Sequence, residues 1–258
     1  MATHQLRFGL VVGQRESWPE LVKRAQAVEA MGLDTAWVVD HFFGGEDEMA
    51  DTHEAYTVLA GLAPETENLR LGVMVAGNTY RNPAVLLKQA VTVDHISNGR
   101  VDFGIGAGWW EREHEAYSYE FPSAKDRVDM LEESLTVIDS FQKNERTTFE
   151  GKHYRYINTP FEPKPVQKPR IPMLIGAGGP RMLKLTARFA DIWNTRSPLD
   201  EAKRKSDLLD HACDEIGRDR SEIMRSVWPH QNVWGSIEEF TEYVESFLEA
   251  GFTDFLFT

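Results

Sequence analysis

The sequence is poor in cysteine: its 258 residues include a single one, Cys213. One thiol excludes an internal disulfide and any metal site built from several cysteines, and such usage is typical of a reducing compartment. Cys213 lies in a helical pattern, DLLDHACDEIG, which indicates a structural role. We therefore expect a cytoplasmic protein.

Long apolar runs and positive charge are scarce as well. No stretch of about 18 consecutive apolar residues occurs, and the N-terminus MATHQLRFG lacks the basic start and apolar core of a signal peptide. The 28 Lys and Arg residues stand against 41 Asp and Glu, which gives a net charge of −13. This charge repels phosphate, so we expect neither nucleic acid nor a membrane as a partner. Local donors must then hold any anionic ligand.

Strand and helix patterns alternate along the whole chain. Strands are predicted at 6–12, 34–40, 69–76, 101–106, 171–175, 191–194, 227–234 and 252–257. Helices are predicted between them at 17–32, 51–62, 83–93, 125–143, 180–189, 208–216 and 237–248. Eight parallel β/α units favour closure into a (β/α)8 TIM barrel over an open doubly wound sheet. We expect one domain spanning residues 1–258.

Two features depart from a simple barrel. Residues 144–170 are polar, aromatic and rich in proline, which indicates an insertion between the fourth and fifth strands, built as a short hairpin and an extended arm. No helical pattern follows the eighth strand, so we expect no terminal helix.

Small, polar and titratable residues gather at the predicted carboxyl ends of the strands, where parallel barrels carry their sites. These ends are Gly13, Asp40–His41, Gly77–Tyr80, Gly106–Trp109, Gly176–Gly179, Asn194–Thr195 and Gln231–Asn232. The stretch Val101–Tyr117 is the most informative, because a strand runs into Gly106, Ala107 and Gly108 and then into two tryptophans. A glycine loop beside a flat apolar wall favours an aromatic, anionic cofactor. The alternative is a tight turn with buried tryptophans.

A second glycine loop, Gly176-Ala177-Gly178-Gly179, leads into a predicted helix. Free amides at a helix start bind phosphate or carboxylate, and Arg181 and Lys184 are expected to assist. Glycine is also common at strand ends for purely conformational reasons.

His41 is the histidine placed directly at a strand end, after Asp40, and is the candidate general acid/base. The alternative is a histidine hydrogen-bonded in a loop, and the same reading applies to His53 and His114. Gly77 and Asn78 end a strand without a large side chain, so a flat ring could lie there; an ordinary Asn-Pro helix entry is the alternative. No spacing indicates metal ligands, and we predict no metal.

Three blocks resemble the bacterial-luciferase-like flavin and deazaflavin oxidoreductases, especially the branch that uses coenzyme F-420. They are GLDTAWVVDHF at 32–42, AGNTYRNP through YEFP at 76–122, and PKPVQKPR through DIWN at 163–194. The resemblance implies a (β/α)8 barrel that forms a homodimer. It also implies hydride transfer between F-420 (8-hydroxy-5-deazaflavin) and a small organic substrate.

The resemblance also implies roles for particular residues. Asp40 and His41 match an Asp-His pair in which the histidine contacts the substrate and the deazaflavin face. Gly77-Asn78 matches a non-prolyl cis peptide that forms a bulge behind the ring. Gly106, Ala107 and Gly108 match a loop near the cofactor's chain, followed by His114, and Gly176, Ala177, Gly178 and Gly179 match the phosphate loop. Trp109 stands where the family's sugar-phosphate dehydrogenases carry a glutamate that donates a proton.

Three functions remain open on the sequence. The first is F-420-dependent hydride transfer with His41 as acid/base. The second is an FMN-dependent monooxygenase that uses reduced flavin and oxygen. The third is a flavin-binding protein without turnover, in which replacing His41 would change nothing. Pocket walls are expected from Phe42, Phe43, Trp109, Trp110 and the arm at 144–170.

Overall fold

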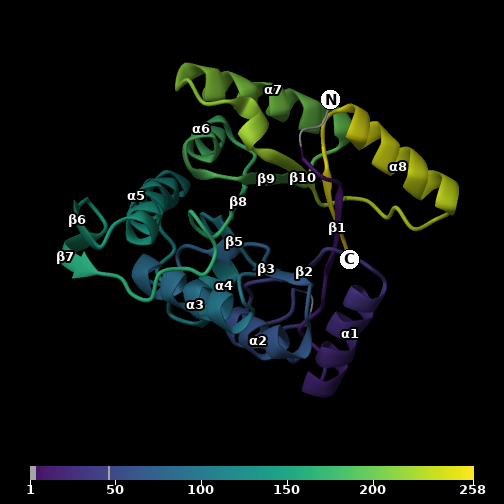
Figure 1. Cartoon of the computed structure of the whole chain (residues 1–258), viewed down its shortest axis with the longest axis horizontal. Helices are drawn as coiled ribbons and strands as arrows, with labels where there is room; N and C mark the ends of the chain where they lie inside the picture. The colour runs from purple at the N-terminus through teal and green to yellow at the C-terminus, as the bar shows by residue number, and fades with distance from the viewer. Residues whose placement is uncertain (1–3, 46) are drawn as a thin grey trace.

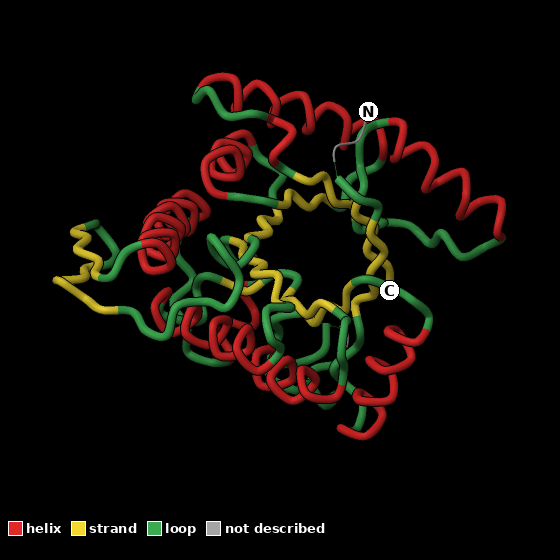
Figure 2. The backbone as a smooth tube through the Cα atoms, viewed as in Figure 1, coloured by secondary structure: helices red, strands yellow, loops and turns green. Residues whose placement is uncertain are grey.

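Eight parallel strands close into a barrel in the computed structural model, which describes residues 4–45 and 47–258 (Figure 2). They are β1 (Arg7–Val11), β2 (Thr35–Val38), β3 (Arg70–Val73), β5 (Val101–Gly106), β8 (Met173–Gly176), β9 (Ile192–Thr195), β10 (Met224–Val227) and β11 (Asp254–Phe257). Pairing of β1 with β11 closes the ring, and a two-residue strand, β4 (Ala76–Gly77), pairs beside the end of β5. The predicted TIM barrel is confirmed.

The helices cover the outside of the barrel (Figure 1). They are α1 (Trp18–Ala30), α2 (Ala55–Leu62), α3 (Pro83–Ile96), α4 (Glu111–Ala116), α5 (Ala124–Lys143), α6 (Pro180–Phe189), α7 (Leu199–Glu215) and α8 (Ile237–Glu249), with 3-10 turns η1 (Ala63–Glu65) and η2 (Arg220–Glu222). Side-chain oxygens of Asn82, Ser123 and Ser236 accept amide hydrogens at the starts of α3, α5 and α8. None of the described helices is long and apolar enough to cross a membrane.

The predicted insertion is present and contains the expected hairpin. Strands β6 (Arg146–Glu150) and β7 (Arg155–Pro160) pair antiparallel and project outward beside α5 (Figure 1). Glu133 of α5 accepts the amides of Lys152, His153 and Tyr154, which ties the hairpin turn to this helix. Strand β11 ends at Phe257, next to the last described residue, Thr258.

Three elements differ from the prediction. Strand β10 occupies Met224–Val227, so the prediction of 227–234 was three residues late and Gln231–Asn232 lie in a loop. The error arose because Arg225 and Ser226 are buried although polar; the guanidinium of Arg225 pairs with Asp210 of α7. Helix α7 begins at Leu199, whereas the prediction began near 208. The start was missed because the first turns of α7 are strongly charged and show little apolar periodicity. The short helix α4 was not predicted.

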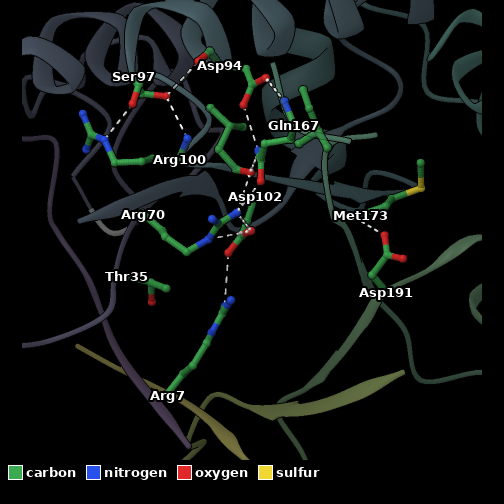
Figure 3. A network of polar contacts seen from close by, with 12 residues as sticks. Arg7, Thr35, Arg70, Asp94, Ser97, Arg100, Asp102, Gln167, Met173 and Asp191 are labelled. Carbon is green, nitrogen blue, oxygen red and sulfur yellow. Dashed lines mark hydrogen bonds and ion pairs between the residues drawn. The ribbon is translucent and has the colours of Figure 1, made fainter. Parts of the chain in front are cut away.

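Buried ion pairs fill the end of the barrel at which the strands begin (Figure 3). Asp102 of β5 accepts from Arg70 of β3 with an Nε–Oδ1 distance of 3.1 Å and lies 3.1 Å from Arg7 of β1. Arg7 also donates to Asp254 of β11 at 2.9 Å. These charges link four strands across the ring and leave the opposite end for a ligand.

Candidate active site

A cavity of about 680 Å³ opens at the carboxyl ends of the strands. Its walls follow β2, β3, β5, β8, β9 and β10. Most predicted site residues line it: Asp40, His41, Gly77, Gly106, Ala107, Gly108, Gly176, Ala177 and Gly178. The glycine-rich strand ends therefore meet at one rim, as the barrel arrangement requires.

Three predicted residues lie outside the lining. Asn78 and His114 are fully buried, and Gly179 is exposed just before α6. The side-chain amide of Asn78 has no hydrogen-bond partner among the described residues. His114 instead supports the rim, because its Nδ1 lies 2.7 Å from the Trp110 carbonyl and its Nε2 lies 2.6 Å from the Thr79 hydroxyl. The His114 ring is thus buried behind the rim and does not line the cavity.

His41 lines the cavity, and its Nδ1 lies 2.9 Å from a carboxylate oxygen of Glu113 on α4. Glu113 is fully buried and also accepts from the Tyr80 hydroxyl and the Phe42 amide, each at 2.5 Å. Burial alone would raise the pKa of Glu113. The hydrogen bonds from His41 and Tyr80 outweigh burial and hold this pKa below its ordinary value.

Asp40 touches the cavity, but its carboxylate is engaged elsewhere. It accepts two hydrogen bonds from Arg81, at 2.7 and 2.8 Å, and one from the Gly77 amide at 2.8 Å. Arg81 also pairs with Glu54 at 2.7 Å. These contacts make Asp40 the anchor of the loop after β4.

Val75 lines the cavity between β3 and β4. The non-prolyl cis peptide bond joins Met74 to Val75, so its expected position at Gly77-Asn78 was wrong. The strand is interrupted between β3 and β4, and Val75 fills space left by glycines on neighbouring strands. A Cβ at Gly106 would lie 2.8 Å from Val75 Cγ2, and one at Gly176 would lie 3.6 Å from it. Gly106 is therefore small because Val75 needs the room.

The loop Gly176–Gly179 precedes α6, whose N-cap Gly179 offers no side-chain acceptor to the first helical amides. The ammonium group of Lys205 on α7 lies beside this loop: a Cβ at Gly178 would be 3.4 Å from its Nζ. Lys205 donates to Ser197 at 2.8 Å, and both line the cavity. Free amides, a helix N-terminus and an ammonium group together suit a phosphate.

The expected assistance from Arg181 and Lys184 is wrong, because both face other helices. Arg181 pairs with Asp129 of α5, and Lys184 pairs with Glu215 of α7 at 2.8 Å. Arg196 supplies a second cation at the cavity instead, with its guanidinium 4.3 Å from the centre of the Trp228 ring.

The expected pocket walls are only partly present. Trp109 lines the cavity, stacks on Trp110 and meets the His41 ring edge-on at 5.7 Å. Phe42, Phe43 and Trp110 pack around α4 behind the lining, and residues of the arm border a separate apolar groove against α2 and α3. None of the residues 144–170, all of which the structure describes, lines the cavity.

One group of described residues, Asp126, Asp129 and His153, brings three possible metal ligands within 4.8 Å of one another. It lies outside the cavity lining. Lys152 pairs with Asp126 at 2.8 Å and Lys125 with Asp129 at 2.7 Å, so ammonium groups already neutralise the two carboxylates.

Sequence reasoning assigned no role to Glu113 or Lys205, and it placed Tyr80 at a strand end without giving it a role. Glu113 and Tyr80 lay inside a block used for the resemblance, but a run such as EREHEA does not show which carboxylate turns inward. Lys205 lies in the charged first half of α7, a part of the chain that no predicted element covered. Its position eight residues after Ser197 becomes meaningful only once the helix is seen to pass the Gly178 loop.

An F-420-dependent glucose-6-phosphate dehydrogenase of Amycolatopsis mediterranei (strain U-32) is 32% identical over 188 residues, which cover 72% of this chain and 56% of that protein. The chain thus spans little more than half the length of this curated relative.

Two solved structures share the fold across nearly the whole chain. An F-420-dependent secondary alcohol dehydrogenase in complex with an F-420–acetone adduct matches with a TM-score of 0.86 at 18% identity, covering 98% of this chain and 93% of that one. The coenzyme F-420-dependent tetrahydromethanopterin reductase from Methanopyrus kandleri matches with a TM-score of 0.84 at 17% identity and the same coverage. At these identities the likeness shows the fold.

The family resemblance seen in the three sequence blocks extends over almost all of the chain. The model of one family, described as luciferase-like monooxygenase, matches residues 2–255. The chain therefore belongs to the luciferase-like monooxygenase family.

Proposed function

We propose that this protein is an oxidoreductase that transfers a hydride between coenzyme F-420 and a small organic substrate. The observation that carries the proposal is one cavity with His41 on one wall and the Gly176–Gly179 loop with Lys205 on another. The curated relative named for F-420 supports this coenzyme. FMN is the alternative, because it also has a flat ring and a phosphate and because the family description names monooxygenases.

The residues present fit a flat ring with a phosphate-bearing tail. Apolar side chains of Met74 and Val75 and the small residues Gly106 and Ala107 offer a surface without bulky groups. Around Gly179, a Cβ would meet nothing within 4 Å, which leaves room for a phosphate at the start of α6. The ring would lie against Val75, and the tail would be held by Gly178 and Lys205.

F-420, when bound, supplies a carbon that accepts or gives a hydride. The protein's part is to move the matching proton. With its Nδ1 proton held by Glu113, His41 presents Nε2 as an acceptor, and no described residue hydrogen-bonds to this atom. When an alcohol is oxidised, Nε2 would take the hydroxyl proton as the carbon's hydride passes to the bound coenzyme and the carbonyl forms. In the reverse direction Nε2 returns the proton to the oxygen.

Substrate contacts fall to residues at the mouth. Trp109 is 70% exposed there and carries no acidic group, so a proton donor at its position is excluded and His41 remains the titratable candidate. This difference argues for a substrate other than a sugar phosphate.

The resemblance to the family supports a homodimer, and the single cysteine supports a cytoplasmic location.

Fluorescence titration of the purified protein with F-420 and with FMN tests the proposal. We expect micromolar binding of F-420 and none of FMN. Binding of FMN alone, with oxygen consumption when the flavin is reduced, would replace the proposal by the monooxygenase function.

The variant His41→Ala separates catalysis from binding. Because His41 moves a proton and does not hold the tail, F-420 affinity should stay within about threefold of the wild type, whereas turnover of a panel of alcohols and carbonyls should fall by about 100-fold or more. His53→Ala, at an exposed loop histidine outside the cavity, is the control. Unchanged turnover in the His41 variant would assign the acid/base to another residue. A wild-type protein that binds the coenzyme but turns over no member of the panel would be a binding protein.

A further inference from the structure

Glu113 is the buried carboxylate behind the proposed acid/base. It comes from α4, is fully buried, and is absent from the cavity lining. A group in this position cannot touch a substrate, so its influence must pass through a neighbour.

Its two oxygens receive three donors. One accepts from His41 Nδ1 at 2.9 Å and from the Tyr80 hydroxyl at 2.5 Å, and the other accepts from the Phe42 amide at 2.5 Å. An ionised carboxylate only accepts hydrogen bonds, so a partner nitrogen must carry hydrogen. The lowered pKa of Glu113 keeps it ionised at neutral pH.

Tyr80 cannot take over as the anion of this group. Burial and the hydrogen bond to Glu113 raise its pKa well above the ordinary value, so its hydroxyl stays protonated and donates. The negative charge remains on Glu113, directly behind the imidazole.

We propose that Glu113 is a positioning residue that fixes the His41 proton on Nδ1 and thereby presents an unprotonated Nε2 to the cavity. The inference rests on the proposed hydride-transfer function. The negative charge of the carboxylate also stabilises the positive charge that the imidazole ring gains when Nε2 accepts a proton. The carboxylate that orients the His41 ring therefore lies behind the ring and not in the cavity.

Glu113→Gln is the informative variant because glutamine has nearly the same shape. Its carbonyl oxygen can still accept from the Phe42 amide, but its NH2 group then faces His41. Nδ1 must become the acceptor, and the proton moves to Nε2, which is the wrong tautomer for accepting a proton from a substrate.

Long-range 1H–15N NMR of the cofactor-free protein reads the tautomer directly, with His41→Ala identifying the signals. We expect Nδ1–H in the wild type and Nε2–H in Glu113→Gln. We also expect kcat to fall by roughly 100-fold or more, with the F-420 dissociation constant within about threefold of the wild type. A merely structural role would not switch the tautomer.

Asp94→Asn is the matched control, since Asp94 is equally buried and accepts from Val166 and Gln167 outside the cavity. It should lower stability without changing the His41 tautomer. The inference is overturned if wild-type His41 carries its proton on Nε2, or if Glu113→Gln keeps the Nδ1 proton or turns over within a few-fold of the wild type. If Glu113→Gln does not fold, the wild-type spectrum alone decides. A wild-type protein that binds neither coenzyme would refute the proposed function and leave the tautomer measurement standing.

Discussion

Lys205 brings a positive charge into the cavity of a protein whose net charge is −13. Only 16% of its side chain is exposed, and it is held by Ser197 at 2.8 Å and Glu201 at 3.4 Å. An ammonium group fixed in this way loses little conformational entropy when it binds an anion. The long-range field repels phosphate, so the local cation matters more here than in a neutral protein.

We expect Lys205→Ala to weaken F-420 binding by about 10- to 100-fold, since a hydrogen bond between charged groups is worth about 1.5–3 kcal/mol. Fluorescence titration would measure F-420 and, in parallel, its deazaflavin ring without the phosphate-bearing tail. The affinity for the bare ring should hardly change. Lys203→Ala, on the exposed face of the same helix, is the control. Equal losses for both ligands would show that Lys205 does not contact the phosphate.

At the scale of elements, the connection between β5 and α4 depends on Gly108. This residue has a φ of 82°, and a Cβ there would lie 2.5 Å from Thr79 Oγ1. Thr79 in turn lies 2.6 Å from His114 Nε2, which holds α4 and therefore Glu113. The loop geometry and the acid/base are thus coupled through one short chain of contacts.

Gly108→Ala should therefore lower the free energy of unfolding by more than the same substitution at an ordinary glycine with a positive φ. Gly251, with a φ of 87° and nothing within 4 Å of an added Cβ, provides the comparison. Gly251→Ala should cost about 1–2 kcal/mol for backbone conformation alone, and Gly108→Ala about 1–3 kcal/mol more because Thr79 must move. Urea unfolding measures both. Equal free energies would mean that Thr79 yields without cost.

The barrel could be predicted from the sequence because apolar strands and amphipathic helices alternate along the whole chain, and an error at one element does not hide this alternation. It misplaced β10 because buried Arg225 and Ser226 break the apolar pattern while pairing with distant residues. His41 and the glycine loops could be located because they directly follow strands in the sequence, and the carboxyl ends of parallel strands lie at the same end of the barrel. It could not find Glu113 or Lys205, because their roles depend on which way α4 and α7 turn toward the barrel.

Across the whole molecule, buried ion pairs link the strands at the end of the barrel where they begin. Burial alone would raise the pKa of Asp102, but the charges of Arg7 and Arg70 outweigh it and lower that pKa. A depressed pKa stabilises the folded state above the ordinary value of about 4, and this stabilisation is lost as pH falls through the lower folded value.

Asp102→Asn should destabilise the protein at neutral pH by about 3–5 kcal/mol, because Arg70 then loses its buried carboxylate partner and Arg7 loses one of its two. The difference in the free energy of unfolding between the variant and the wild type should become smaller as the pH is lowered from about 5 toward about 2, because the wild-type carboxylate is then protonated and uncharged like the asparagine. Urea unfolding across this range provides the measurement, and Asp214→Asn, at an exposed ion pair, should change little. A difference that is constant with pH would contradict the role assigned to this charge.

The packing of Val75 against glycines on adjacent strands has an evolutionary consequence. A Cβ at Gly106 would lie 2.8 Å from Val75 Cγ2, whereas one at Gly104 would meet the backbone carbonyl oxygen of Val73 at 2.0 Å. Gly106 therefore cannot enlarge while valine remains, and a smaller residue at 75 would leave a hole until Gly106 became larger. Positions 75 and 106 are inherited as a pair and should covary in an alignment of descendants, while Gly104 is held by the backbone and should stay constant.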